Sequence, residues 1–154
     1  MKGTPTFKTM SDRDSRALLR RSRVGRLAFT FRDRVDIEPI GYVLDGSWLY
    51  GRTSYGEKLD VTGTTWWPVA FEVDEVEELF RWRSVVVHGG FYTLENKGVE
   101  MHREKWREGV ALLRSLVPET FTGADPAPQR TVVFCLAVQE ITGREAVPVA
   151  AGGP

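Results

Sequence analysis

Hydrophobic and polar residues alternate in several stretches of the chain, with the period of two that is typical of half-buried β-strands. Between residues 24 and 31, for example, Leu27, Phe29 and Phe31 fall on one face, and smaller or polar residues fall on the other. The dipeptide Asp45-Gly46 is a strong hairpin signal between two such stretches. The pattern predicts strands at about residues 24–31, 35–44, 47–52, 69–73, 84–94 and 130–141.

Two longer segments have the 3.6-residue period of amphipathic helices instead. The first is expected from Ser11 to about Arg21, with Ser11 as the cap of its first turn and Asp14 three residues further on. The second is expected over residues 100–117, where an apolar stripe repeats at helical spacing. A short helix is also expected near residues 57–62, and the tail after Pro148 is expected to be disordered.

Six or so strands with mostly short connections, interrupted by three helices, predict a mainly β fold. We expect an antiparallel β-barrel with peripheral helices, rather than an alternating parallel α/β sheet. Side chains fill the interior of a small barrel, so a large planar ligand has to bind outside it, in a groove on the wall or between two subunits. One domain is expected over residues 1–148, followed by the tail of residues 149–154.

Apolar surface beyond the needs of one small barrel predicts a second copy of the chain. The last strand is apolar on both faces around residues 132–138, and Trp66, Trp67, Trp82 and Trp106 are more tryptophans than such a barrel readily encloses. A two-fold homodimer is the commonest way to cover such surface.

Charge and composition exclude several classes of function. Lys plus Arg equals Asp plus Glu at 21 each, so no overall field attracts a nucleic acid or an anionic membrane. No secretion signal and no run of roughly 18 apolar residues is present, which favours a soluble cytoplasmic protein. Cys135 lies in an apolar run and is expected to be a buried hydrophobe rather than a nucleophile. His88 and His102 lack neighbours at metal-ligand spacing, so no metal site is expected.

The segment of residues 50–59 has the composition of a phosphate-binding loop. Arg52 can offer a planar fork of donors and Lys58 a mobile point charge close to the start of the expected short helix. Thr53 and Ser54 can add hydroxyl donors, and Gly56 allows close approach of the backbone. A polar turn that carries two exposed charges is the alternative interpretation of the same residues.

Several spaced motifs follow one another along the chain: Leu18-Leu19, Val24-Gly25-Arg26-Leu27-Ala28-Phe29, Pro39-Ile40-Gly41-Tyr42, Asp45-Gly46, Arg52-Thr53-Ser54-Tyr55-Gly56-Glu57-Lys58-Leu59, Val69-Ala70-Phe71-Glu72-Val73-Asp74, Trp82-Arg83-Ser84-Val85-Val86-Val87-His88-Gly89 and Glu140-Ile141-Thr142-Gly143-Arg144. Taken together and in this order, the motifs resemble the pyridoxamine 5′-phosphate oxidase-like superfamily. More narrowly, the chain is similar to the flavin-binding branch that includes the nitroimidazole-resistance proteins. The resemblance extends from about Asp12 to Arg144 and implies a split β-barrel that dimerises and holds FMN at the subunit interface.

The resemblance also implies roles for individual residues around the flavin. It places Arg52, Ser54 and Lys58 near the phosphate and ribityl chain, Thr53 at the polar edge of the ring and Leu59 in the same motif beside the cofactor. The backbone of Ile40, Gly41 and Tyr42 would run along the ring, Trp82 and Ser84 would come from the partner subunit, and Arg144 would close the site. The alternatives are that Tyr42 is a core aromatic, that Trp82 is an interface anchor, and that Arg144 is a solvated charge after a turn glycine.

The chain also departs from the family pattern. Gly41 stands where many flavin-binding relatives have a polar residue, and residues 61–67 replace a more basic segment. The arginine-rich signature that pyridoxamine phosphate oxidases use for their substrate is not recognisable after residue 139, so oxidation of vitamin B6 is not favoured. The resemblance implies an FMN-dependent oxidoreductase that acts with a small-molecule electron donor and acceptor, and no side chain is identified as catalytic. There are two alternatives: a flavin-binding or storage protein without turnover, and a relative that uses a deazaflavin or haem in place of FMN.

Overall fold

A computed structural model describes residues 3–31, 33–54 and 67–149 of the chain. The described elements, in chain order, are β1 (Thr6–Thr9), α1 (Asp12–Arg21), β2 (Val24–Phe31), β3 (Arg34–Asp45), β4 (Trp48–Thr53), β5 (Trp67–Glu78), β6 (Arg81–Leu94), α3 (Glu100–Leu116) and β7 (Val132–Val147). The short helix expected at residues 57–62 lies outside the described residues, as do residues 150–154 of the expected tail.

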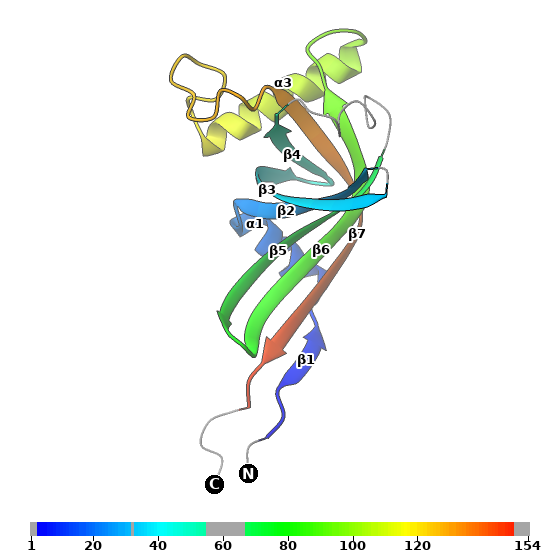
Figure 1. Cartoon of the computed structure of the whole chain (residues 1–154), viewed down its shortest axis with the longest axis vertical. Coiled ribbons are helices and arrows are strands. Elements are labelled where there is room, and N and C mark those ends of the chain that lie inside the picture. The colour runs from blue at the N-terminus through cyan, green and yellow to red at the C-terminus, as the bar shows by residue number, and fades with distance from the viewer. Residues whose placement is uncertain (1–2, 32, 55–66, 150–154) are drawn as a thin grey trace.

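The strands form one antiparallel sheet that closes into a barrel. The order of the strands is β1-β7-β4-β3-β2-β5-β6, and a further pairing of β6 with β7 joins the two sides. The predicted mainly β fold, a barrel with peripheral helices, is therefore confirmed. Figure 1 shows α3 lying across one end of the molecule, while the hairpin of β5 and β6, the end of β7 and β1 extend from the barrel as an arm.

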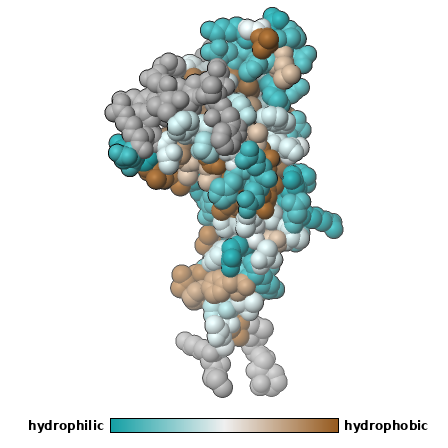
Figure 2. Space-filling model, turned by 90° about the vertical axis from the view of Figure 1, so that its right-hand side faces the viewer, coloured by the Kyte–Doolittle hydropathy of each residue, from teal (hydrophilic) through white to brown (hydrophobic). Residues whose placement is uncertain are grey.

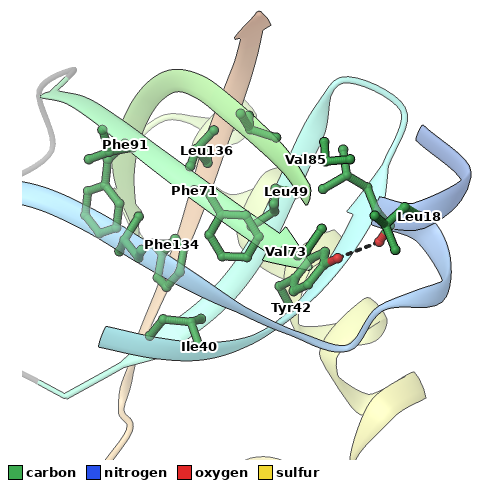
Figure 3. Packing of buried hydrophobic residues seen from close by; sticks show 14 of the residues in the cluster. Leu18, Ile40, Tyr42, Leu49, Phe71, Val73, Val85, Phe91, Phe134 and Leu136 are labelled. Carbon is green, nitrogen blue, oxygen red and sulfur yellow. Dashed lines mark hydrogen bonds between the residues drawn. The ribbon is translucent and has the colours of Figure 1, made fainter. Parts of the chain in front are cut away.

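The interior of the barrel is filled by side chains, as expected for its size. Tyr42 and Phe71 pack edge to face, with ring centroids 4.8 Å apart, and Figure 3 shows them among aliphatic side chains from several strands. The helix α1 contributes Leu18 and Leu19 to the same core. The hydroxyl of Tyr42 donates a 2.6 Å hydrogen bond to the Leu19 carbonyl, so α1 is held against the barrel by both packing and a buried hydrogen bond.

The helix α1 begins as the sequence predicts. The Ser11 side chain accepts a hydrogen bond from the Asp14 backbone N–H at 3.1 Å, which is the expected cap. Gly46 adopts a φ of 60° in the hairpin between β3 and β4, a conformation that glycine reaches without the penalty other residues incur. The helix cap at Ser11 and the hairpin at Gly46 therefore form where the sequence predicts them.

The second apolar face of β7 is covered by α3 of the same chain. Val133 and Cys135 on β7 form a second buried cluster with Val110 and Leu113 of α3. This arrangement corrects one argument from the sequence, because the doubly apolar strand does not require a second copy of the chain to cover it. Trp106 packs against this cluster as well.

Three strands are longer than their hydrophobic pattern predicts. β5 continues to Glu78, β6 begins at Arg81 and β7 continues to Val147, so these strands run on into the arm. Only Leu79 and Phe80 connect β5 to β6. The short strand β1, which the sequence pattern did not predict, pairs with the end of β7. Figure 2 shows apolar surface on the narrow part of the molecule, where Phe7 packs near Phe80.

Candidate functional site

A row of polar side chains crosses the outer wall of the barrel. Directly opposite residues of an antiparallel pair share one face of the sheet, and the register pairs Arg26 with Glu72, Asp74 with Ser84, and Ser84 with Arg144. Their chain neighbours, such as Leu27, Phe71 and Val85, point into the core, so these five side chains point outward. We call Arg26, Glu72, Asp74, Ser84 and Arg144 the polar row.

Hydrogen bonds connect four members of the polar row. The Arg26 guanidinium lies 2.7 Å from a Glu72 carboxylate oxygen and 2.8 Å from Asp74 Oδ1. These contacts raise the pKa of Arg26, with the hydrogen bond to Asp74 as the main cause. Ser84 Oγ donates a 2.9 Å hydrogen bond to the other oxygen of Glu72. The row is therefore an ordered network on the wall rather than a set of independent surface charges.

Apolar side chains border the polar row on the same wall. Ile37 lies opposite Ala28, and Val35 lies opposite Thr30, so both share the outward face. Their exposed fractions are 66% and 76%, which is high for aliphatic residues on a sheet. Val24, which is also exposed, lies opposite Gly41. Gly41 therefore faces outward on β3, as Ser84 and Arg144 do on β6 and β7, three and four strands further along the sheet.

The predicted neighbours of Gly41 point the other way. The side chains of Ile40 and Tyr42 are buried in the barrel core, at 2% and 1% exposure, which agrees with the alternative of Tyr42 as a core aromatic. Any contact of these two residues with a ligand is left to their backbone. The Tyr42 N–H already donates to the Arg23 carbonyl at 3.0 Å.

The structure gives Arg52 a partner within the protein. Its guanidinium is buried and makes two hydrogen bonds, of 2.7 and 2.6 Å, with the two carboxylate oxygens of Asp125. It also donates to the carbonyls of Ala127 and Arg130, each at 3.3 Å. Most donors of Arg52 are thus committed to the loop between α3 and β7. The polar-turn alternative, with Arg52 as an exposed charge, is wrong for this residue.

The remaining residues of the predicted phosphate loop are only partly described. Thr53 is buried at the end of β4, and its hydroxyl donates to Glu38 at 3.4 Å. Ser54, next in the chain, is exposed. Lys58 and Leu59 lie outside the described residues, so their predicted roles stay predictions.

Trp82 lies on the arm at the margin of the wall. It is half-buried, and its ring centroid is 6.2 Å from that of Phe7. Trp82 also lines a 140 Å³ hollow with charged residues that include Glu75 and Arg81. Pockets for drug-sized ligands typically measure about 300–1,000 Å³. This hollow is therefore too small to enclose a flavin.

Arg144 is exposed on β7, opposite Ser84. The preceding Gly143 is not a turn glycine, as one alternative supposed, because it lies inside β7 and beneath α1. A Cβ atom at Gly143 would lie 2.1 Å from Ser15 Oγ. The close approach of α1 accounts for this glycine. Arg144, the next residue of β7, faces outward.

The structure thus brings Ser84 and Arg144 side by side, places Gly41 on the same outward face of the sheet three strands from Ser84, and leaves Arg52 in a buried ion pair. The sequence prediction did not identify Arg26, Glu72 and Asp74 as members of the site. Period-two alternation places Glu72 and Asp74 on one face of their strand, which was an available signal. The pairing of β2 with β5, which brings Arg26 to them, is a long-range contact with no local signature.

Among the residues that the structure describes, no helix is long and apolar enough to cross a membrane. Within the same ranges, no group of three or more His, Cys, Asp or Glu side chains is arranged to hold a metal ion.

Similar folds occur in several proteins of known structure. An FAD-binding protein from Mesorhizobium loti is 26% identical, with a TM-score of 0.68, and the match covers 90% of this chain and 96% of that one. A conserved protein of unknown function from Corynebacterium diphtheriae is 27% identical, with a TM-score of 0.67 and coverages of 92% and 98%. A candidate 5-nitroimidazole antibiotic-resistance protein from Bacteroides thetaiotaomicron is 15% identical, with a TM-score of 0.69 and coverages of 94% and 90%. No curated protein matches the chain significantly.

The family model described as pyridoxamine 5′-phosphate oxidase matches residues 11–145, which include α1, β2 to β6, α3 and all but the last two residues of β7. The flavin-binding proteins among the structural neighbours share this architecture. The chain belongs to the pyridoxamine 5′-phosphate oxidase family.

Proposed function

We propose that this protein binds a flavin nucleotide, FMN, on the outer wall of its barrel and acts as a flavin-dependent oxidoreductase. The observation that carries flavin binding is the 26% identity, over nearly the full length of both chains, to a protein described as FAD-binding. The choice of FMN rests on the ordered motifs of the sequence and the family that they resemble. The substrate of pyridoxamine phosphate oxidases is not part of the proposal, because their arginine-rich signature is not recognisable here.

The described residues fit the polar part of a flavin in one region and not in another. On the outer face of the barrel, Ser84 and Arg144 offer polar groups on β6 and β7, and Gly41 on β3 offers a surface from which no side chain projects. Arg52 does not fit the phosphate role, because its donors bind Asp125 and two carbonyls. We therefore assign the phosphate to Ser54 and Lys58.

A bound flavin would supply the capacity to accept and release a hydride or electrons. The task of the protein is then to bind, orient and shield the ring. The wall can do this through the surface at Gly41, which carries no side chain, and through the fixed hydrogen-bonding groups of the polar row. The proposal gives no side chain the role of obligatory acid or base.

A second copy of the chain is part of the proposal, because the wall alone is open. Val35 and Ile37 expose apolar surface beside the polar row, and a copy packed there would cover this surface and enclose a flavin between two walls. Trp82 and Ser84 would then face the flavin together with residues of the partner.

The first test is the visible spectrum of the purified protein, followed by fluorescence titration with FMN, FAD and riboflavin. We expect FMN to bind more tightly than riboflavin, because riboflavin lacks the phosphate. Tighter binding of FAD than of FMN would change the cofactor in the proposal, and absence of flavin binding would refute it. Bound flavin that a nicotinamide reduces and an added acceptor reoxidises would support the oxidoreductase activity, whereas inert flavin would favour a binding protein.

Lys58→Ala tests the phosphate assignment. We expect it to weaken FMN binding by about 1.5–3 kcal/mol, the contribution of a charge-assisted contact, while riboflavin binding hardly changes. An equal effect on both ligands, or no effect on either, would contradict the phosphate role of Lys58.

A further inference from the structure

The direction of one hydrogen bond in the polar row determines what the wall can recognise. Ser84 Oγ lies 2.9 Å from one carboxylate oxygen of Glu72, and Arg26 lies 2.7 Å from the other. An ionised carboxylate only accepts hydrogen bonds. The Ser84 hydroxyl must therefore be the donor, and its single proton is directed at Glu72.

Arg26 stabilises this arrangement. It makes ion pairs with both Glu72 and Asp74, so Arg26 and Ser84 each engage one oxygen of the Glu72 carboxylate. Glu72 thus stays an acceptor, and Ser84 retains only lone pairs for any further partner. Ser84 is half-buried, so part of its surface remains open on the outer face of β6.

The residue directly opposite Ser84 has the complementary chemistry. Arg144 lies across from Ser84 in the pairing of β6 with β7, and a guanidinium only donates hydrogen bonds. The wall therefore presents an acceptor and a donor side by side. A group with an N–H next to a carbonyl matches this pair, whereas a group with two adjacent acceptors does not.

We propose that Ser84 accepts a hydrogen bond from an N–H of the bound ligand, and that Glu72, held by Arg26, enforces this direction. The inference rests on the flavin site proposed above. The oxidised flavin ring has one N–H, at N3, and carbonyl groups flank it on both sides. Ser84 accepts from N3–H and Arg144 donates to one of these carbonyls, which makes Ser84 a specificity-determining residue for the pyrimidine edge of the ring.

The alternative is that the bond between Ser84 and Glu72 only links β6 to β5. The two possibilities differ in their response to a ligand that lacks the N–H. FMN and 3-methyl-FMN are a suitable pair of probes, because methylation at N3 removes that donor and leaves the phosphate and the carbonyls in place.

The experiment measures the affinity of both probes by fluorescence titration in the full-length protein and in three variants. In the unmodified protein we expect FMN to bind roughly 5- to 100-fold more tightly than 3-methyl-FMN, the effect of one hydrogen bond with a partner that would otherwise stay unpaired. Ser84→Ala removes the acceptor, so this ratio should fall below about 3-fold.

Glu72→Gln separates hydrogen bonding from the size of the added methyl group. The variant retains Ser84, but the glutamine amide can donate to Ser84 Oγ, so the hydroxyl proton is free to turn toward the ligand. We expect the preference for FMN to fall in this variant. Glu75→Gln is the matched control: it removes a carboxylate of the same strand that pairs with Arg21 and lies outside the polar row, so it should keep the ratio of the unmodified protein.

Each outcome decides for or against the proposed role of Ser84. Equal affinity for FMN and 3-methyl-FMN in the unmodified protein would overturn the role of Ser84 while leaving flavin binding intact. An unchanged ratio in Glu72→Gln would show that the methyl group is rejected by its size alone, and would also overturn it. Failure of FMN itself to bind would overturn the proposed function and this inference together.

Discussion

Arg52 holds the loop between α3 and β7 against the end of β4. Its two hydrogen bonds to Asp125 form a buried, bidentate ion pair, and its guanidinium lies 5.2 Å from the centre of the Phe121 ring. Asp125 also accepts hydrogen bonds from the backbone N–H groups of Phe121 and Ala127. Phe121 has a φ of 59°, a region that non-glycine residues seldom occupy, so this loop depends on its contacts for its shape.

Replacing Arg52 should therefore destabilise the protein whether or not a flavin is bound. Arg52→Met leaves the Asp125 carboxylate buried without its partner, and we expect the melting temperature to fall by on the order of 10 °C. Arg34→Met is the control, because the pair of Arg34 with Asp36 is exposed and should matter little. A similar small change in both variants, measured by thermal unfolding, would contradict the structural role of Arg52.

The pair of Arg52 and Asp125 should also make the free energy of unfolding depend on pH. The hydrogen bond from Arg52 holds the pKa of Asp125 well below its usual range. A carboxyl whose pKa is lowered on folding stabilises the protein above its unfolded pKa of about 3.9, and the stabilisation is lost as the pH falls below that value. Asp125→Asn should remove this component of the acid dependence.

At the scale of elements, α3 covers the outer side of β4 and β7 and buries the side chains between them. Cys135 of β7 is buried beneath it, and burial raises the pKa of its thiol to about 11. Lys105 of α3 lies 3.6 Å from the centre of the Trp48 ring and 3.2 Å from the Tyr50 hydroxyl. The helix is thus attached to the wall of the barrel by apolar and polar contacts.

Cys135 should consequently report on the opening of α3. We expect a disulfide reagent at pH 8 to label it at least roughly 100-fold more slowly in the native protein than in denaturant, because the thiol is both covered and protonated.

The raised pKa of the Cys135 thiol should also contribute stability that is complete below about pH 9 and lost as the pH rises toward 11. The difference in urea stability between the unmodified protein and Cys135→Ala should shrink over that range, and a constant difference would contradict the shift.

The docking of α1 on β7 offers a second test at this scale. A Cβ at Gly143 would lie 2.1 Å from Ser15 Oγ and 2.9 Å from Met10 Cβ, so Gly143→Ala should cost about 1–3 kcal/mol in the free energy of unfolding. Ser15→Ala removes the nearest atom, and the double variant should lose less than the sum of the two single changes. Gly123→Ala, with no atom within 4 Å of its Cβ, should change little. Additive losses in urea unfolding would show that the crowding is relieved elsewhere.

Elements with strong local signals could be predicted, and contacts between distant segments could not. β2 has the predicted bounds of Val24–Phe31, and Gly46 marks the predicted hairpin. The hairpin of the arm was missed because Leu79 and Phe80 carry none of the usual turn chemistry. The ion pair of Arg52 with Asp125 joins residues 73 positions apart. The sequence therefore indicated Arg52 as an anion-binding residue, but it could not show that Arg52 pairs with a carboxylate of the same chain.

For the whole molecule, the two sides of the barrel have different environments. α3 covers β4 and β7, whereas Val35 and Ile37 of β3 expose their side chains beside the polar row. Exposed apolar residues that border an ordered polar network are typical of an interface. The proposed homodimer therefore has a specific surface, which differs from the face of β7 that the sequence pattern first suggested.

Ile37→Glu tests that surface. Ile37 is 66% exposed in the single chain, so the stability of the fold should change by no more than about 1 kcal/mol. If a second copy covers the wall, the buried glutamate would be left without a partner, and the dimer should dissociate. Light scattering should then give a mass near 17.4 kDa for Ile37→Glu and near twice that value for the unmodified protein. Met101→Glu changes a residue of similar exposure on α3, and it should remain a dimer and bind FMN normally. Because the proposed flavin site needs both walls, Ile37→Glu should also weaken FMN binding, and a variant that keeps both its mass and its FMN affinity would place the interface elsewhere.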